Sequence, residues 1–403
     1  MKVLYIDVLC KSGSTGKIVY ELCTRTLSDG IEAAVCHGRG PTPGEDFTYK
    51  FGLDWETALH ALLTRVTGRT GCYSFFSTRR LLKFMDKFQP DVVHLHEPHA
   101  YFINLRPFFD YLAAHKIPLV YTFHCEFAYT GKCGFSYECD RWKTGCGHCP
   151  HLRDYPSVLF SDATAAMHRE KKELLSKQNM VIVCPSEWLA ERVKASFLSK
   201  FPVRVIPNGI DTGVFSPADT QSLRKKLGLS DEKILLSVAP DFDDPRKGLD
   251  YVIKLAERFK NDKVRFYMIG KISEDIKLPE NMVAVGRTES QKELAEYYSL
   301  ADCYVICSDM ENLPTTCLEA VCCGTPVAGF DAGGTKETAP APTGSFCKFG
   351  DIDALEASVR NFLETPLPQN AFEVLRKKYS GEYMYSSYRK LFKELTTGAK
   401  SHD

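Results

Sequence analysis

Short, continuously apolar runs alternate with longer amphipathic segments along almost the whole chain. Unbroken apolar runs are typical of parallel strands covered by helices on both faces of a sheet. The segments between them carry apolar residues at helical spacing, as in Lys17–Leu27 and Leu249–Phe259. We therefore expect an α/β protein with doubly wound parallel sheets. The predicted strands are Val3–Val8, Ala33–Cys36, Asp91–Leu95, Leu119–Phe123, Val181–Cys184, Val203–Ile206, Ile234–Val238, Val264–Ile269, Val283–Val285, Cys303–Cys307 and Pro326–Ala328.

This series of strands is too long for one sheet of about 5–6 strands, and 403 residues suit two or three domains. The turn-rich stretch Ile206–Asp211 marks the boundary. We expect an N-terminal domain of residues 1–205, a C-terminal domain of residues 206–371 and a tail of residues 372–403. Within the tail, Phe372–Leu395 is predicted to be helical and to cross back. The expected architecture is two Rossmann-like domains facing a cleft.

Composition limits the class of protein and its compartment. The 51 Lys and Arg residues balance the 51 Asp and Glu residues, which argues against a protein that coats nucleic acid. No stretch approaches the ~18 apolar residues of a membrane span, and Met1–Val8 is too short for a signal peptide. The 16 cysteines are scattered, as expected for thiols in a reducing compartment. We expect a cytoplasmic protein with no nucleic-acid partner.

The most informative segment runs from Ser308 to Val327, directly after the predicted strand Cys303–Cys307. It opens a helix expected over Thr315–Cys323, whose first amides would suit a phosphate or a polar sugar. Glu311 and Glu319 could face one site there, since carboxylates accept hydrogen bonds from sugar hydroxyls. On spacing alone, a helix-capping Glu311 and a solvated Glu319 fit the pattern equally well.

A second candidate site is the basic turn formed by Arg246 and Lys247, between a predicted strand and a predicted helix. Two adjacent cations there suit a diphosphate whose charge grows as it leaves, although a solvated surface pair has the same pattern. No convincing Asp-x-Asp site for a divalent cation follows a predicted strand at the cleft, and Asp351–Asp353 opens a late helix and is explained more simply as a cap. We therefore expect no catalytic divalent metal.

In the N-terminal half, Gly13, Ser14, Thr15 and Gly16 join the first strand to the first helix. Glycines in such a turn let the backbone approach a phosphate at the start of the helix. The spacing before Lys17 is not that of a P-loop. A single glycine turn is more often structural than functional.

Histidines close two predicted strands of the same half. His124 follows Leu119–Phe123 and His96 follows Asp91–Leu95, so both should lie at the carboxyl edge of the sheet. A lone histidine after a strand is more often a hydrogen-bonded structural residue than a catalyst. For His96 we expect a supporting role in the core.

Four cysteines gather in a glycine-rich loop around Trp142, with five, six and two residues between them. Four thiols satisfy a tetrahedral zinc site in type and number, and a metal held by four protein ligands would be structural. The first interval is longer than in a usual zinc knuckle, and free thiols or a redox pair are the competing interpretations. The four residues are Cys133, Cys139, Cys146 and Cys149.

The segment from Glu311 through Glu319 to Gly324–Val327 resembles the signature of the family 4 retaining glycosyltransferases of GT-B fold. Gly333–Glu337 and Pro207–Asp211 are similar to further motifs of that family, so the resemblance covers almost the whole chain. It implies a nucleotide-diphosphate sugar donor, with Glu319 on the ribose and Glu311 on the donor sugar. The resemblance also places the backbone of Asn312, Leu313, Pro314 and Thr315 along the donor, although Pro314 has no N–H to donate.

The resemblance assigns three further parts of the chain. Lys247 matches the family's phosphate-binding lysine, and Arg246 takes the task of an arginine that the family carries several residues earlier. The turn Gly13–Gly16 matches the loop that faces the donor phosphate and the acceptor. His124 matches a histidine that approaches the donor sugar, and Cys125 stands where the family usually has an aspartate.

The cysteine-rich loop 125–155 resembles an insertion in a subgroup of bacterial exopolysaccharide and capsule assembly enzymes. This resemblance implies a glycan or lipid-linked acceptor and an enzyme that is cytoplasmic or peripheral at the inner face of the membrane. The segment Tyr73–Phe88 would offer a membrane-facing surface, but an ordinary helix with its apolar side in the core fits as well. That segment contributes Phe75, Phe76, Arg79, Arg80, Lys83 and Phe84.

Two other functions fit the expected fold. A nucleotide-sugar epimerase or hydrolase would use the same donor site without a sugar acceptor. A non-catalytic, zinc-bearing scaffold would bind no nucleotide, and the presence of Glu311, Glu319 and Lys247 counts against it.

Overall fold

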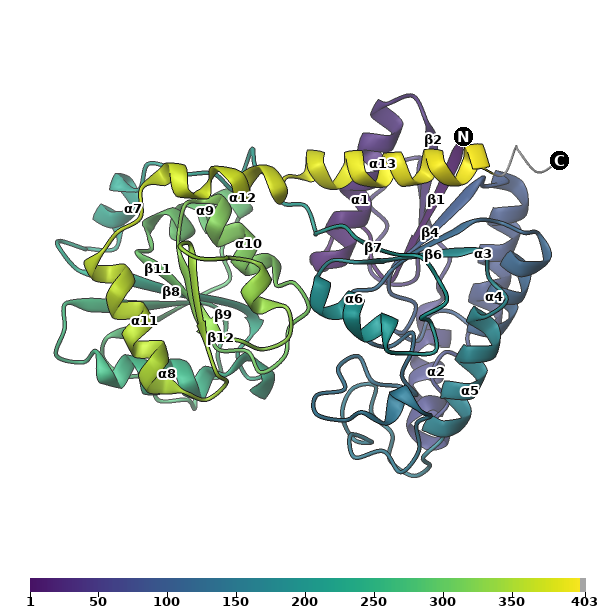
Figure 1. Cartoon of the computed structure of the whole chain (residues 1–403), viewed down its shortest axis with the longest axis horizontal. Helices are drawn as coiled ribbons and strands as arrows, with labels where there is room; N and C mark the ends of the chain where they lie inside the picture. Colours follow the sequence, from purple (N-terminus) through teal and green to yellow (C-terminus); the bar gives the residue numbers. More distant parts are fainter. Residues whose placement is uncertain (399–403) are drawn as a thin grey trace. The chain divides into compact units, whose positions relative to one another are not determined.

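The structure, a computed structural model, describes residues 1–398, and the last five residues of the expected tail, 399–403, lie outside the described residues. The described chain forms two compact units, one of residues 1–206 with residues 385–398, and one of residues 207–384. Each unit is a parallel sheet with helices on both faces (Figure 1). The prediction of two doubly wound α/β domains is confirmed.

The first unit contains a seven-stranded sheet in the order β3-β2-β1-β4-β5-β6-β7, with all neighbouring strands parallel. The strand order reverses between β1 and β4, so the connections that leave these two strands go to opposite sides. The elements are β1 Lys2–Asp7, α1 Gly13–Ser28, β2 Glu32–His37, β3 Thr48–Lys50, α2 Asp54–Thr67, α3 Phe75–Phe88, β4 Val92–Leu95, α4 Leu105–Ala114, β5 Leu119–Thr122, η1 Arg141–Lys143, α5 Thr164–Leu175, β6 Met180–Cys184, α6 Glu187–Lys194 and β7 Val203–Val205.

The second unit contains a six-stranded parallel sheet in the order β10-β9-β8-β11-β12-β13, which reverses between β8 and β11. Its elements are α7 Gln221–Lys226, β8 Lys233–Asp241, η2 Pro245–Lys247, α8 Leu249–Arg258, β9 Val264–Lys271, β10 Met282–Gly286, α9 Gln291–Leu300, β11 Cys303–Ile306, α10 Thr315–Cys322, β12 Val327–Phe330, η3 Thr335–Glu337, β13 Gly344–Cys347, α11 Ile352–Glu364, η4 Gln369–Phe372 and α12 Glu373–Lys378. The last helix, α13 Gly381–Gly398, starts in this unit and continues in the first.

Both faces of the second sheet are buried, which explains the continuous apolar runs. Ile234 and Leu236 of β8 pack into one apolar cluster, and Leu235 between them packs into another on the opposite face. Because successive side chains of a strand point to opposite faces, a strand covered on both sides has no polar positions in its middle.

All eleven predicted strands form, but three features differ from the prediction. Strands β3 and β13 were not predicted, because they are short and only half-buried. Helix α1 begins at Gly13 rather than Lys17, so the predicted glycine turn is its first turn. The expected tail helix is broken near Tyr379 into α12 and α13.

Helix α13 is fixed to the first unit by aromatic and polar contacts, and Figure 1 shows it running across this unit. Tyr388 packs against the His94 ring at 4.6 Å between centroids, and its hydroxyl lies 2.9 Å from the hydroxyl of Thr122. Phe392 packs edge-on against Tyr5 of β1. These contacts explain why residues 385–398 group with the first unit.

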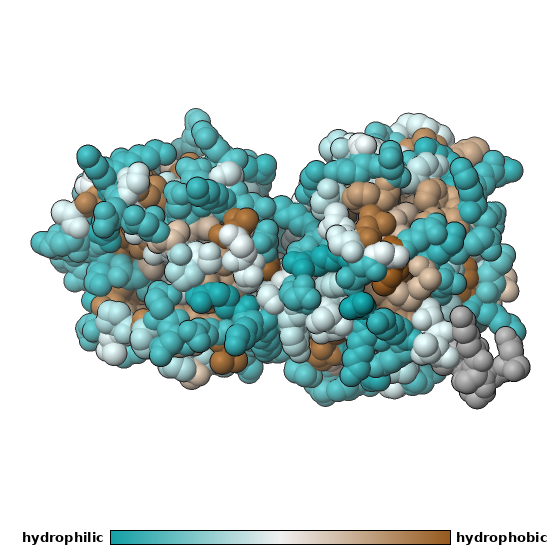
Figure 2. Space-filling view, turned by 90° about the horizontal axis from the view of Figure 1, so that it is seen from above, coloured by the Kyte–Doolittle hydropathy of each residue, from teal (hydrophilic) through white to brown (hydrophobic). Residues whose placement is uncertain are grey.

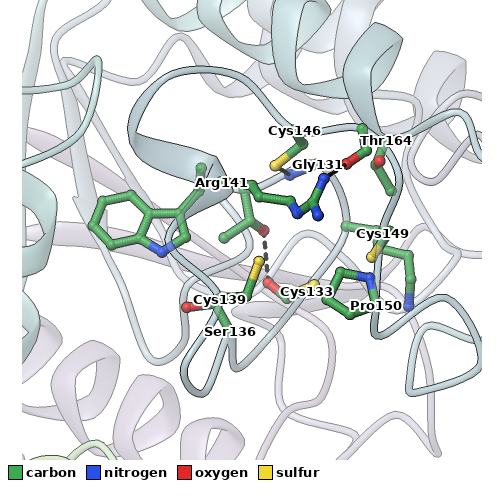
Figure 3. Close-up of a pocket in the computed structure, with 13 residues that line it drawn as sticks. Gly131, Cys133, Ser136, Cys139, Arg141, Cys146, Cys149, Pro150 and Thr164 are labelled. Atoms are coloured by element: carbon green, nitrogen blue, oxygen red, sulfur yellow. Dashed lines mark hydrogen bonds between the residues drawn. The ribbon is translucent and has the colours of Figure 1, made fainter.

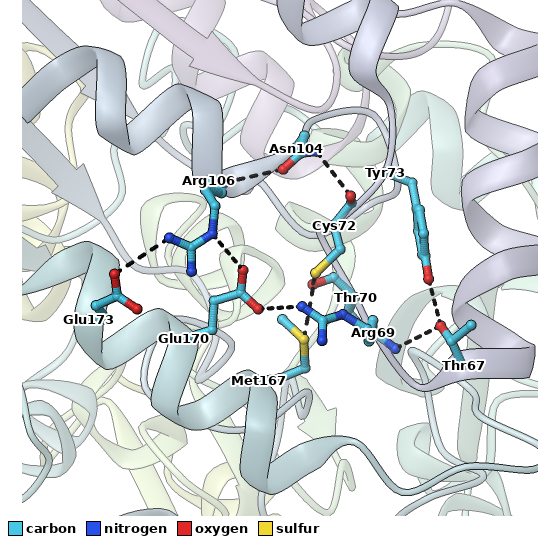
Figure 4. A network of polar contacts seen from close by, with 10 residues as sticks. All are labelled: Thr67, Arg69, Thr70, Cys72, Tyr73, Asn104, Arg106, Met167, Glu170 and Glu173. Carbon is cyan, nitrogen blue, oxygen red and sulfur yellow. Dashed lines mark hydrogen bonds and ion pairs between the residues drawn. The ribbon is translucent and has the colours of Figure 1, made fainter.

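Helix α5, which follows the cysteine-rich loop, is held by a network of ion pairs (Figure 4). The carboxylate of Glu170 on α5 accepts hydrogen bonds from Arg69, after α2, at 2.7 Å and from Arg106 on α4 at 3.1 Å. Its side chain is only 15% exposed, so this carboxylate is better shielded from water than either arginine.

We predict that Glu170→Gln lowers the free energy of unfolding by about 1–2 kcal/mol, because two arginines lose their shared carboxylate. Glu173→Gln is the matched control, since the Glu173 side chain is 53% exposed at the edge of the same network. This substitution should change the free energy of unfolding much less than Glu170→Gln does. Urea unfolding of both variants measures the difference. Equal losses in the two variants would contradict the shielding argument.

Candidate functional site

In the second unit, three loops meet at the carboxyl ends of β8, β11 and β12. The turn containing Gly248 packs so closely on the end of β11 that a Cβ at this glycine would lie 2.1 Å from the carbonyl oxygen of Cys307. A Cβ at Gly333 would lie 2.1 Å from the carbonyl oxygen of Glu311, and that oxygen accepts a hydrogen bond from the Gly334 amide at 2.9 Å. Both Gly248 and Gly333 also have positive φ. These positions therefore favour glycine for two reasons, the close approach of another backbone and the left-handed conformation.

This packing brings the predicted basic turn to the predicted glutamate loop. Lys247 Nζ donates to Glu311 Oε1 at 2.5 Å, and neither side chain is more than 23% exposed. Arg246 forms an ion pair with Asp244 at 2.5 Å. The buried Oδ1 of Asp309 has no protein partner among the described residues, and burial raises the pKa of this carboxyl above its usual range. The turn and the loop therefore gather acids and bases around the start of α10.

Glu319 lies one turn into α10, where the hydroxyl of Tyr298 donates to its Oε2 at 2.9 Å. Tyr298 is fully buried, so it fixes the position of that carboxylate. The start of α10 at Thr315 has Pro314 as its N-cap and no side-chain cap. Uncapped first amides of a helix are donors suited to an anion or a polar sugar. Glu311 does not cap the helix, which settles one of the alternatives left open by its spacing.

In the first unit, a second polar cluster lies where β1, β4 and β5 end. Asp7 closes β1, and its Oδ1 accepts a hydrogen bond from the Glu97 amide at 3.2 Å. His96 Nδ1 lies 2.9 Å from His124 Nε2, so one of the two rings donates a hydrogen bond to the other. Side-chain ligand atoms of Glu97, His99 and Cys125 lie within 4.8 Å of one another. A carboxylate, an imidazole and a thiol form a donor set that suits Zn²⁺, but the hydrogen bond between Cys125 and Glu97 already accounts for their approach.

Burial shifts the ionisation of this cluster. Desolvation raises the pKa of Asp7 to about 7, helped by the charge of Glu97 and opposed by hydrogen bonds from Val8 and Thr15. Desolvation likewise raises the pKa of Glu97 to about 7. Desolvation lowers the pKa of His124 to about 4, so this ring is neutral at physiological pH. A neutral histidine can orient a sugar through hydrogen bonds but carries no proton to give as an acid.

The glycine turn contributes to the same cluster. Gly13 has a φ of 69° and Gly16 accepts a hydrogen bond from the Lys11 amide at 2.9 Å, which folds the chain back at the start of α1. The preceding Ser12 provides no side-chain cap. Thr15 reaches the carboxyl of Asp7, while Ser14 lies in the same exposed first turn.

The four cysteines of the loop line one small pocket (Figure 3). The thiols of Cys133 and Cys149 hydrogen-bond each other, and the Gly131 amide donates to Cys146 Sγ at 3.1 Å. In a tetrahedral zinc site with Zn–S bonds of about 2.3 Å, the sulfurs lie about 3.8 Å apart. Within residues 1–398, no three of these thiols lie within 4.8 Å of one another. The zinc site therefore stays a prediction, because the thiols share a pocket but do not form the coordination shell.

The loop is anchored instead by Glu126, which the sequence did not single out. This fully buried carboxylate pairs with Arg192 of α6 at 2.6 Å and accepts the Ser136 amide at 2.5 Å. Arg192 also lies over the ring of the buried Trp142, 4.9 Å from its centroid. A buried ion pair with several hydrogen bonds can hold a loop that contains only one short helix, η1.

Several site residues were missed by the sequence analysis for a common reason. Asp7 lies inside a predicted strand, Glu97 follows one and Asp309 lies in the segment after another, but the importance of these residues and of Tyr298 depends on neighbours that are distant in sequence. The polar ends of otherwise apolar strands were the available signal for Asp7 and Glu97. The prediction that Asp351 caps a late helix is confirmed, since its side chain accepts the Ala354 amide at 3.0 Å.

Comparison with known families agrees with this arrangement. Residues 15–214 match the family described as Glycosyltransferase Family 4, and residues 219–378 match Glycosyl transferases group 1. The two matches correspond to the two Rossmann-like units that carry the polar clusters. The chain is a glycosyltransferase of GT-B fold, built from a family 4 domain and a group 1 domain.

Individual proteins resemble the chain over nearly its whole length. It is 24% identical to the putative colanic acid biosynthesis glycosyl transferase WcaC of Escherichia coli (strain K12), over 98% of this chain and 100% of the relative. Sucrose-phosphate synthase of Thermosynechococcus elongatus has a TM-score of 0.71 at 16% identity, over 98% of this chain and 99% of that chain. Anabaena HepE in complex with UDP-glucose has a TM-score of 0.68 at 14% identity, over 98% and 100%. These structural likenesses show the fold.

We predict that Asp7→Asn stabilises the protein more at pH 8 than at pH 5. The folded state holds the Asp7 proton up to about pH 7, whereas the unfolded chain releases it near pH 4, so stability is lost as the pH rises between these values. At about 1.4 kcal/mol per pH unit, the variant's advantage should grow by roughly 2–3 kcal/mol from pH 5 to pH 8. Urea unfolding at both pH values measures it.

The control for this prediction is Asp250→Asn, at an exposed position of α8. Its effect on the free energy of unfolding should be small and the same at both pH values. An Asp7→Asn effect that is also independent of pH would show that Asp7 is ionised in the folded protein.

Proposed function

We propose that the chain is a retaining glycosyltransferase that moves a sugar from a nucleotide-diphosphate sugar to a glycan or lipid-linked acceptor. The observation that carries the proposal is the contact of Lys247 with Glu311 beside the uncapped start of α10. A diphosphate needs a cation and free amides, and a sugar needs a carboxylate for its hydroxyls. All three kinds of group lie together in the second unit.

The proposed donor site uses the residues around that contact. Lys247 and Arg246 neutralise the diphosphate, whose charge grows as the bond to the sugar breaks. Glu319, held by Tyr298, accepts hydrogen bonds from the ribose hydroxyls. Glu311 orients the donor sugar once a phosphate has drawn Lys247 away. The backbone of Asn312, Leu313, Pro314 and Thr315 lies along the donor, and the proposed charge compensation needs no catalytic divalent metal.

The first unit supplies the proposed acceptor side. His124 is neutral and held by His96, which suits a ring that orients a sugar without protonating it. The amides of the first turn of α1, from Gly13 to Gly16, are available to a donor phosphate or an acceptor hydroxyl. The family resemblance implies that the acceptor attacks on the face from which the diphosphate leaves, so positioning by these groups is the main proposed contribution of the protein.

The proposed setting is the synthesis of bacterial surface polysaccharide in the cytoplasm, at or near the inner face of the membrane. The relative named for colanic acid biosynthesis, which matches over its full length, supports this setting. The likeness to HepE, whose structure holds UDP-glucose, supports a sugar nucleotide as the donor class.

We predict that one nucleoside diphosphate from a panel of UDP, GDP and ADP, with CMP as a monophosphate, raises the Tm of the purified protein. At a concentration of about 100 times its Kd, such a ligand stabilises the native state by roughly 2.7 kcal/mol. The shift should be lost in Glu319→Gln, because the ribose loses its charged acceptor. Differential scanning fluorimetry measures both proteins side by side.

Glu257→Gln, on the exposed face of α8 in the same unit, is the matched control and should retain the full shift. No shift with any nucleotide would overturn the donor site. If the matching sugar nucleotide releases its diphosphate equally fast with and without an acceptor, the activity is that of a hydrolase rather than a transferase.

A further inference from the structure

Exposed apolar side chains are concentrated in one part of the first unit. Nine of the fourteen large apolar residues that are exposed in residues 1–398 belong to α2, the start of α3 and the segment 155–160. The other five exposed residues lie outside these segments, and scattered exposure of this kind is normal. Figure 2 shows one face of the molecule, which is mainly hydrophilic, with apolar side chains gathered over part of the first unit. The nine residues, here called the α2–α3 apolar face, are Trp55, Leu59, Leu62, Val66, Phe75, Phe76, Tyr155, Leu159 and Phe160.

Helix α2 is inverted relative to an ordinary surface helix. Trp55, Leu59, Leu62 and Val66 follow each other at intervals of four, three and four residues, which places them on one side of the helix, and each is 45–57% exposed. The side of α2 that is buried carries mainly polar residues. Those buried residues are Glu56, Thr57, His60 and Thr64.

The buried polar residues of α2 have partners inside the protein. The carboxylate of Glu56 accepts the amides of Phe76 and Ser77 at 2.8 and 2.7 Å, which caps α3. His60 contacts the hydroxyl of Ser74 at 2.8 Å and the amide of Gly71 at 3.1 Å. The orientation of α2 is therefore fixed by these contacts, and its apolar side is held outward.

The three segments form one continuous surface. Trp55 of α2 packs against Phe76 of α3 with 5.9 Å between ring centroids. The Leu159 amide donates to the carbonyl of Arg65 on α2 at 2.9 Å, which ties the segment 155–160 alongside that helix. Phe160 is the most exposed member at 78%, and Phe75 and Phe76 are about equally exposed at 61% and 60%.

The charged residues beside this surface are mainly basic. Helices α2 and α3 carry five basic residues outside the core but only two exposed acidic ones, since Glu56 is buried. One of the acidic residues, Asp54, is already paired with Lys50 at 2.9 Å. The basic residues are Arg65, Arg79, Arg80, Lys83 and Lys87, and the acidic ones are Asp54 and Asp86.

We propose that the α2–α3 apolar face docks this chain on the surface of an anionic lipid bilayer. Apolar and aromatic side chains on one side of a helix, flanked by Lys and Arg, match the boundary between acyl chains and anionic headgroups. A second copy of the chain fits less well, because a two-fold contact through this face would bring like charges together. Among residues 1–398, no helix is long and apolar enough to cross a bilayer, and the proposed contact lies at the membrane surface.

The inference deepens the proposed function, because a lipid-linked acceptor has its reactive sugar at the membrane surface. It does not depend on the donor site, which lies in the other unit. The two proposals can therefore fail separately.

The test compares the full chain with two triple variants in cosedimentation with vesicles of phosphatidylcholine, alone or with phosphatidylglycerol. The face variant is Leu62→Ser/Phe75→Ser/Phe76→Ser. The control variant, Phe349→Ser/Val374→Ser/Tyr383→Ser, removes side chains that are 42–75% exposed in the other unit. All six positions are exposed, so circular dichroism should show three folded proteins.

We expect the parent and the control variant to bind vesicles that contain phosphatidylglycerol, and the face variant to bind at least tenfold more weakly. Binding should fall with added salt and be weak on phosphatidylcholine alone. Trp55 fluorescence should shift to shorter wavelength on binding, and Trp55→Phe should remove most of that shift.

Three results would overturn the proposal. The first is no binding of the parent to anionic vesicles, and the second is equal binding by the face variant. The third is a parent protein that does not bind vesicles but forms a dimer, detected by light scattering, while the face variant is a monomer. A second copy of the chain would then be the occupant of the face. The Tm shift with nucleotide should be the same in all three proteins, so loss of vesicle binding leaves the donor site intact.

Discussion

The reversal of strand order in each sheet is the constraint on which the candidate sites depend. In the first unit it falls between β1 and β4, and in the second between β8 and β11. Connections that leave the two central strands diverge there, so backbone does not cover their carboxyl ends. Asp7, Glu97 and His124 lie at that edge of the first sheet, and Lys247 and Glu311 lie at that edge of the second.

The ion pair of Lys247 and Glu311 is the main charged contact of the candidate site at the carboxyl edge of the second sheet. Two glycines make the approach possible, because Gly248 and Gly333 let neighbouring loops pack directly on backbone carbonyls. Each charge of the pair has a proposed ligand group that competes for it, a phosphate for Lys247 and a sugar hydroxyl for Glu311. Before the donor binds, Lys247 and Glu311 are therefore paired with each other and shielded from water. This pairing avoids the free-energy cost of burying either charge without a partner.

Strands and candidate site residues could be predicted from the sequence, because they follow from local patterns of residues. Contacts between residues that are distant in sequence could not be predicted in this way. Continuous apolar runs predicted all eleven strands of the series, and the spacing of Glu311 and Glu319 placed both near the start of α10. The contact of Glu311 with Lys247, 64 residues away, could not follow from spacing. The inversion of α2 also escaped prediction, because the polar partners that bury Glu56 come from another helix.

The most direct test of the donor site is a double-mutant cycle on the affinity of the nucleoside diphosphate that stabilises the protein. Calorimetry would give Kd for the parent, Lys247→Met, Glu311→Gln and the double variant. We expect Lys247→Met to raise Kd at least tenfold, about 1.4 kcal/mol, and Glu311→Gln to lower Kd, because Lys247 no longer has to leave a carboxylate. That gain should vanish in the double variant. Kd values within twofold of the parent in both single variants would contradict the account.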